Sequence, residues 1–444
     1  MQRKILTISA FFLIAGLLKA QDTSAISARV SELSDALSST NETIAEMKST
    51  LDALKKIKLS GYIQAQFQAT NGSGGWNGSS TSAPTAVGSY SGGAFPKDVS
   101  SRFSVRRGRL KATYDNELTQ YVIQIDVTQS GVSIKDAYVK LTEPWKKWIS
   151  LTAGVFDRPF GFEISYSSSN RESPERSRMF QILFPGERDL GMKIEINPTT
   201  GTLSVFNLKA GLFNGTGIAN EVDNKKDFIG RLGVSLPFDD INLAIDGGFS
   251  LYSGAVRSNS KYIYSKIFNV DSSTSNIGKY FDRTYYGLDV QLYYDIPVIG
   301  GFSIRGEVIK GQQPGTQASS SFYNPGTTST PLFKRNFLGY YLCYVQNIGL
   351  KNQFVLKYDV YEPNIDGSSK NIGVSGNYMG LGDIKFTTLG VGWIYHWDAN
   401  IKFTTYYEIV TNDEVNQGTT STTFAPYKTD IKDNVFTFRI QYKF

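Results

Sequence analysis

The chain has 444 residues, among them 28 Phe, 26 Tyr, 42 Gly and 1 Cys, and its mean hydropathy is −0.24. This composition excludes a helix-bundle membrane protein, whose spans each need about 20 apolar residues, and the single Cys343 excludes a disulfide framework. The formal charge of +6 includes Arg3, Lys4 and Lys19. Without them it is about +3, so nothing indicates a nucleic-acid partner.

Residues 1–20 have the pattern of an export signal. Arg3 and Lys4 precede the apolar run 5–18, and the small residue Ala20 stands at the expected cleavage point. The run is shorter than the roughly 20 residues that a membrane-spanning helix needs, which makes a retained membrane helix the weaker alternative. We therefore predict an exported chain whose signal peptide covers residues 1–20.

Residues 21–56 follow with apolar side chains at alternating steps of four and three. This heptad spacing is typical of a coiled coil, and Thr40 fills the one seam position that lacks an apolar residue. We expect a periplasmic helical stalk, formed by three copies of the chain. The alternative is a single amphipathic helix packed on a barrel or inside its mouth. The predicted oligomerisation seam consists of Ile26, Val30, Leu33, Leu37, Ile44, Met47, Leu51 and Leu54.

From residue 57 onward apolar and polar residues alternate, with Gly, Asn, Asp and Pro between the alternating runs. A strand that crosses a bilayer turns apolar side chains to lipid and polar ones to an aqueous lumen. The pattern predicts an all-β fold, a transmembrane antiparallel β-barrel over 57–444 with about sixteen strands. The expected strands are 57–68, 102–114, 119–128, 132–141, 148–156, 189–196, 202–213, 227–236, 241–252, 281–294, 301–309, 337–345, 353–361, 384–397, 401–410 and 433–444.

The predicted connections alternate in length. An outer-membrane barrel has short turns on the periplasmic side and longer loops outside. The Gly/Ser-rich stretch 71–93 is therefore interpreted as an outer loop, although it also has the composition of a linker. The expected periplasmic turns are 115–118, 143–147, 197–201, 237–240, 296–300, 347–352 and 398–400. The expected outer loops are 69–101, 157–188, 214–226, 253–280, 310–336, 362–383 and 411–432, with 129–131 as a brief exception.

The last predicted strand ends at Phe444, in the manner of strands that the barrel-assembly machinery recognises in the outer membrane. One face is apolar and is expected against outer-membrane lipid, and the other is polar and is expected in the lumen. The lipid-facing side chains are Phe436, Phe438, Ile440, Tyr442 and Phe444, and the lumenal ones are Arg439, Gln441 and Lys443.

Alternation also directs other charged side chains inward. Arg107, Arg109 and Lys111 form a basic row on one wall, and Arg231, Arg305 and Arg439 are expected on other strands. Acidic residues share the same faces, so pairing across strands accounts for many of these charges. The basic row is the first candidate for a pore lining, because it favours anions without forbidding cations.

The third outer loop, 157–188, is rich in arginine. An empty barrel of this size leaves a wide channel, and a long loop folded inward would narrow it. Arginine suits a constriction because its charge is permanent and its donors have a fixed geometry. Alternatively, these arginines pair with Glu172, Glu175 and Glu187 on an outer surface. The candidate constriction residues of the loop are Arg158, Arg171, Arg176, Arg178 and Arg188.

Five short segments of the sequence are unspecific one by one, but their occurrence in this order is a specific signal. They are 106–111, 134–139, 152–161, 175–177 and 186–191. With them the sequence resembles the phosphate-selective porin O and P family of outer-membrane channels, most clearly over residues 60–192 and in the carboxyl-terminal strand. The resemblance implies a sixteen-stranded trimeric porin with an inward loop and, in anion-selective members, a ladder of lumenal arginines. Arg107, Arg109 and Arg188 stand at matching positions, whereas the rest of this wall mixes acids with bases.

Catalysis is not expected. The single histidine, His396, lies at a predicted strand end between Tyr395 and Trp397, where a lipid-boundary position explains it better than a catalytic base. One His and one Cys make neither a zinc nor an iron site of the usual kind, so we expect no metal and no cofactor. The predicted function is passive diffusion of small hydrophilic solutes and ions, with a mild preference for anions. The alternatives are a channel selective for phosphate or another oxyanion, and a barrel that serves as a surface adhesin or envelope tether.

Overall fold

The structure is a computed structural model that describes residues 2–72, 88–96, 98–265, 267, 269–325 and 327–444. The chain divides into two compact units, 1–58 and 59–444. The first contains the helix α1 (Gln2–Lys55). The described part of the chain contains no helix with the length and hydrophobicity that a membrane-spanning helix requires.

The predicted heptad seam lies on α1 as an exposed apolar row. Its described members, Val30 to Leu54, have 52–69% of their surface exposed, and the hydroxyl of Thr40 donates to the carbonyl of Ala36 at 2.7 Å. Thr40 therefore leaves no unpaired donor on the seam. The side chain of Ile26 and those of the predicted export signal lie outside the described part.

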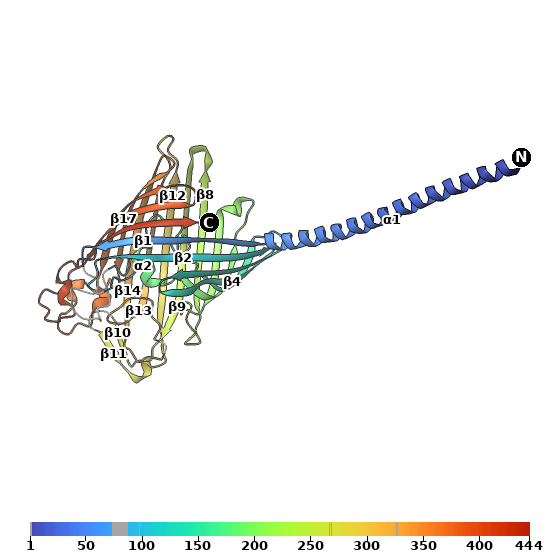
Figure 1. Cartoon of the computed structure of the whole chain (residues 1–444). Coiled ribbons are helices and arrows are strands. Elements are labelled where there is room, and N and C mark those ends of the chain that lie inside the picture. The colour runs from blue at the N-terminus through green and yellow to red at the C-terminus, as the bar shows by residue number, and fades with distance from the viewer. Residues whose placement is uncertain (1, 73–87, 97, 266, 268, 326) are drawn as a thin grey trace. The chain divides into compact units, whose positions relative to one another are not determined.

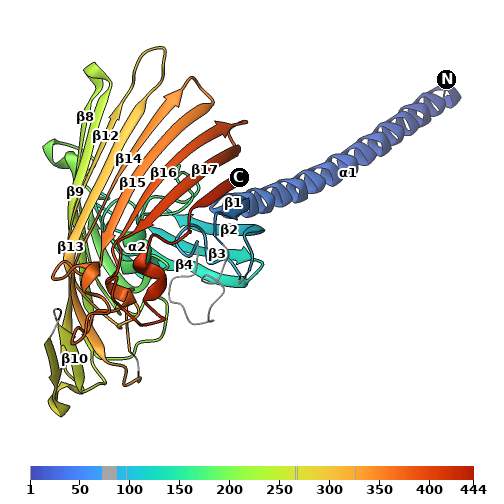
Figure 2. The same cartoon turned by 90° about the vertical axis from the view of Figure 1, so that its left-hand side faces the viewer.

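The second unit is an antiparallel β-barrel with sixteen wall strands among the described residues, as predicted (Figures 1 and 2). The predicted strands are all present, with ends shifted by a few residues. The wall strands are β1 (Ile57–Thr70), β2 (Ser101–Asn116), β3 (Thr119–Thr128), β4 (Gly131–Thr142), β5 (Ile149–Asp157), β6 (Arg188–Ile196), β7 (Phe206–Phe213), β8 (Asp227–Phe238), β9 (Leu243–Arg257), β12 (Tyr280–Tyr294), β13 (Phe302–Gly315), β14 (Leu332–Ile348), β15 (Asn352–Glu362), β16 (Phe386–His396), β17 (Ile401–Asn412) and β18 (Val435–Lys443).

The barrel closes where its first strand meets its last. β1 pairs with β18 from Tyr62↔Lys443 to Thr70↔Val435, and β1 also pairs with β2. Closure leaves no unpaired edge, which a membrane-embedded sheet requires because lipid offers no hydrogen bonds. The side chains of β18 alternate as predicted: Arg439 and Gln441 are 3% exposed, whereas Phe438 and Ile440 are 36% and 42% exposed.

Three features differ from the sequence prediction. The short strands β10 (Tyr262–Ser265) and β11 (Asn269–Ser272) form a hairpin in the outer loop between β9 and β12, and β10 also pairs with β14. Several wall strands extend beyond their predicted ends, as β14 does from residue 332 to 348. Residues 202–205, predicted as strand, form a 3₁₀ turn before β7. Alternation identifies the part of each strand that faces lipid, but it does not show how far strand pairing continues beyond that part.

Candidate functional site

The third outer loop lies inside the barrel, against the wall opposite its own strands. The backbone N–H groups of Phe162 and Glu163 donate to the carboxylate of Glu307 on β13, at 2.8 and 2.6 Å. Gly161 precedes them with φ +62 and donates to Ser250 Oγ on β9 at 2.9 Å. A Cβ on Gly161 would lie 2.3 Å from a Glu307 carboxylate oxygen, so the close approach requires glycine.

An aromatic cluster fills the lumen on this side. Phe160, Phe180 and Phe184 of the loop, two of them in or beside the short helix α2 (Arg178–Leu183), pack against rings that point inward from the wall. Phe184 lies 5.6 Å from Tyr285 and 6.0 Å from Tyr252, measured between ring centroids. These edge-to-face pairs are favourable beyond their burial. This half of the lumen is therefore a packed core that leaves little room for solute.

Ion pairs hold the opposite side of the loop. The Glu175 carboxylate accepts hydrogen bonds from Arg106 and Arg107 on β2 at 2.8 Å each, and from Arg439 on β18 at 3.0 Å. Burial alone would raise the pKa of Glu175, but the guanidinium groups of Arg106, Arg107 and Arg439 hold this pKa well below its usual value. Glu175 therefore stays ionised and ties the loop to two strands.

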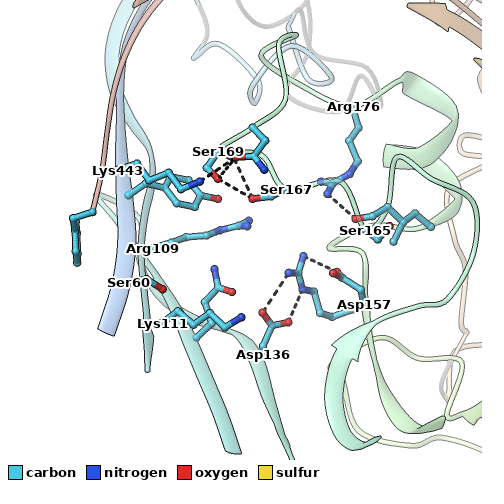
Figure 3. A pocket seen from close by; sticks show the side chains of 17 residues that line it. Ser60, Arg109, Lys111, Asp136, Asp157, Ser165, Ser167, Ser169, Arg176 and Lys443 are labelled. Atoms are coloured by element: carbon cyan, nitrogen blue, oxygen red, sulfur yellow. Dashed lines mark hydrogen bonds and ion pairs between the residues drawn. The ribbon is translucent and has the colours of Figure 1, made fainter. Parts of the chain in front are cut away.

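Two cavities, together called the passage, lie between the loop and the wall, mainly at β2, β3 and β4. Their volumes are about 330 Å³ toward the short turns and about 240 Å³ toward the long loops, and Arg109 and Arg176 line both. Figure 3 shows the larger cavity, with Arg109 and Lys111 on one side and Ser167 and Ser169 of the loop facing them. Arg109 on the wall and Arg176 on the loop therefore mark the boundary between the two cavities.

The lining of the passage is basic. Eight cationic and five acidic side chains line the two cavities, a formal excess of three positive charges. Several are paired: Arg109 lies 3.3 Å from Asp126, and Arg188 lies 3.0 Å from both Asp136 and Asp157. Lys111 and Lys135 form no ion pair with any described residue. The cations are Arg106, Arg107, Arg109, Lys111, Lys135, Arg176, Arg188 and Lys443, and the acids are Asp126, Asp136, Asp157, Glu175 and Glu187.

Lys135 was missed by sequence alternation. Gln124 pairs with Asp136 and the next residue, Ile125, pairs with Ile134, so Lys135 is the extra residue of a β-bulge. A bulge lets two successive side chains leave on the same side of the sheet. Both Lys135 and Asp136 therefore face the passage, whereas strict alternation would place Lys135 in lipid.

The structure brings together five of the eleven predicted pore residues: Arg107, Arg109, Lys111, Arg176 and Arg188 line the passage. The other six line neither cavity, and each makes other contacts. Arg158 pairs with Asp189, Arg231 with Asp289, Arg305 with Glu172 and Arg439 with Glu175, Arg171 donates to the backbone of Ser173 and Pro174, and Arg178 lies over the rings of Tyr90 and Phe386.

No cluster of His, Cys, Asp or Glu suited to a metal ion occurs in the described part of the chain. His396, at the end of β16, shares a 3.0 Å hydrogen bond with the side chain of Gln353 on the neighbouring strand. The buried Cys343 faces Arg305.

Comparison with known proteins agrees with this architecture. The outer membrane channel DcaP of Acinetobacter baumannii matches with a TM-score of 0.50 at 12% identity, over 87% of this chain and 97% of that one. Pseudomonas putida OprB, in its high pH structure, matches with a TM-score of 0.56 at 10% identity, over 89% of this chain and 96% of that one. Identities this low show the fold alone. No curated protein sequence matches. Residues 87–242 match the family described as "Phosphate-selective porin O and P". The chain is therefore an outer-membrane porin that is similar, over about a third of its length, to the phosphate-selective porin O and P family.

Proposed function

We propose that this porin carries small hydrophilic solutes and ions passively, with a mild preference for anions, through the passage between the third loop and β2–β4. The observation that carries the proposal is the excess of cationic side chains around both cavities. A passing anion gains favourable electrostatic energy along such a lining, and a cation loses it. The flow follows the solute gradient.

Selectivity for phosphate or another oxyanion is the second candidate. It is supported by Arg107, Arg109 and Arg188 on the wall with Arg176 opposite, because guanidinium groups bind phosphate oxygens in a fixed geometry. Against it, Asp126, Asp136 and Asp157 occupy part of that donor capacity. We therefore favour a general preference for anions.

Planar-bilayer recording tests both candidates. The porin should insert with stepwise increases in conductance, and in a KCl gradient the reversal potential should have the sign of a chloride preference. Replacing chloride by phosphate then separates the candidates, because a phosphate-selective pore would keep its current and a general pore would lose much of it. A bilayer that stays closed at high protein load would overturn the channel proposal and favour the adhesin or envelope tether.

We further propose that α1 is a periplasmic stalk in which three copies associate through the heptad seam, after removal of the export signal 1–20. The exposed seam supports this, since no described residue of its own unit covers it. The rows that flank the seam are mostly small or uncharged, such as Ser34, Ala36, Asn41 and Thr43. Wide neutral flanks suit a helix that contacts two neighbours at once. The partners proposed for the barrel are outer-membrane lipid and, through the strand ending at Phe444, the assembly machinery.

A further inference from the structure

A second outer loop contacts the loop that narrows the lumen. Residues 316–331 connect β13 and β14, and from this connection the backbone N–H of Phe322 donates to the carbonyl of Ile182 in α2 at 2.8 Å. Ile182 and Leu183 are buried, and Phe180 and Gln181 of the same helix line the outer cavity of the passage. The contact therefore reaches the helix that forms one side of the pore.

The Phe322 ring also lies against two guanidinium groups. Arg158, the first residue of the inward loop, is centred 4.6 Å from the ring centroid, and Arg283 on β12 is centred 3.9 Å from it. Cation–π contacts of this kind are strongest where water is excluded. The ring thus joins the inward loop to the wall through two cations that would otherwise repel each other.

Arg158 depends on the ring more than Arg283 does. The Arg158 side chain is fully buried and its Nε donates to Asp189 at 3.1 Å, but neither terminal nitrogen has a hydrogen-bond partner among the described residues. A buried guanidinium without partners is costly. Arg283, in contrast, donates to the carbonyl of Gly215 at 3.0 Å and also to Asp227 and the carbonyl of Tyr323.

We propose that Phe322 is a positioning residue for the pore: it fastens α2 and the start of the inward loop from the extracellular side, and so sets the width of the passage. This inference deepens the proposed channel function and rests on it. Without the ring, Arg158 keeps only its more distant aromatic contact, with the Phe184 ring, whose centroid lies 5.9 Å away. The loop then moves between its packed position and a displaced one, and the passage fluctuates.

Single-channel recording of the full-length porin tests this proposal. Phe322→Ala should make conductance fluctuations about tenfold more frequent, because two cation–π contacts at a desolvated site are lost, and it should admit larger uncharged solutes in liposome-swelling assays. Phe322→Tyr keeps the ring and should behave like the native porin. Phe322→Leu keeps apolar bulk without the ring and should lie between them.

Phe424→Ala is the matched control, because Phe424 packs in a separate cluster of outer-loop residues with Ile372 and Val415. It should leave the fluctuations unchanged. If a folded Phe322→Ala porin shows no more conductance fluctuations than the native porin, the positioning role of Phe322 is contradicted. The proposed channel function would be unaffected. If Phe322→Ala does not fold, Phe322→Leu replaces it in the test. Conductance fluctuations in Phe322→Leu as rare as in the native porin would also contradict the positioning role of Phe322. Absence of conductance in the native porin would instead contradict the channel function itself.

Discussion

At the scale of single residues, the passage depends on which side chains reach the lumen. Alternation along β2 was enough to predict that Arg107, Arg109 and Lys111 point inward, because a strand buried against lipid on one face fixes the direction of every second side chain. Lys135 could not be found in this way, since a bulge reverses the direction after one extra residue. Nor could alternation tell which inward arginines would be tied up in ion pairs.

Lys111 and Lys135 offer the most direct test of the charge at this scale. The double variant Lys111→Gln, Lys135→Gln removes two unpaired positive charges from the passage and should lower the ratio of anion to cation permeability. A charge about 6 Å from an ion in water contributes about 0.7 kcal/mol, so each is worth roughly a factor of three. Reversal potentials measure the ratio. Lys193→Gln, which changes a wall lysine that lines neither cavity, should leave it unchanged, and an equal effect of both would contradict the assignment.

Asp433, in the outer loop before β18, should make stability depend on pH. Burial raises the pKa of its carboxyl to about 7, against the opposing effect of Arg178, with Asp430 adding to the rise. Between the two pKa values the folded chain holds a proton that the unfolded chain releases, so this stability is fully present only below the ordinary pKa of 3.8 and is lost as pH rises to about 7. Between pH 6 and pH 8 the loss is about 1.4 kcal/mol. Urea unfolding should show that Asp433→Asn reduces the difference between the two pH values. An unreduced difference would refute the assignment.

At the scale of elements, the inward loop is the feature that turns a barrel into a narrow pore. Its charge and length suggested an inward position, but its apolar packing was not foreseen. Phe160, Phe180 and Phe184 meet inward-facing tyrosines from strands that are distant in sequence. A pattern of alternation shows that Tyr252 and Tyr285 face the lumen, yet not that another element fills the space beside them.

A substitution at Gly161, with a matched control, tests how the inward loop is held in place. Gly161→Ala forces a left-handed residue and places its Cβ against the Glu307 carboxylate, so the loop should be displaced and the conductance should rise. Gly349→Ala has similar backbone strain, about 1 kcal/mol, because φ is +60, but its Cβ meets nothing within 4 Å and it lines neither cavity. Bilayer recordings should therefore separate the two. Equal conductance in both variants would contradict the role of Glu307 in holding the inward loop in place.

The helix α1 can be tested through its seam. Ile44→Asp places a charge on the seam and should lower the temperature at which the proposed trimer dissociates on gels run without boiling, because a buried unpaired carboxylate is costly. Ser39→Asp adds the same charge away from the seam and should not. If both variants dissociate like the native porin, the heptads have another role.

At the scale of the whole molecule, most of the barrel could be read from the sequence. Two independent patterns agree on it: strands with one apolar face, and connections that alternate between short and long, such as 349–351 and 363–385. The hairpin β10–β11 was not predicted, because it lies in an outer loop, where contact with lipid imposes no alternation on the sequence. The division of the lumen into an apolar core and a basic passage emerged only from the folded chain, because it joins loop and wall residues far apart in sequence.

The central claim is that solutes pass between the inward loop and β2–β4, and a thiol placed in that passage tests it most directly. Ser167 is exposed and lines the larger cavity, and the native Cys343 is buried and should stay unmodified. Labelling Ser167→Cys with a bulky thiosulfonate should remove most of the single-channel current. Labelling Ser204→Cys, in the turn before β7 and outside both cavities, should not. A fully labelled Ser167→Cys porin that conducts like the unlabelled one would contradict the account.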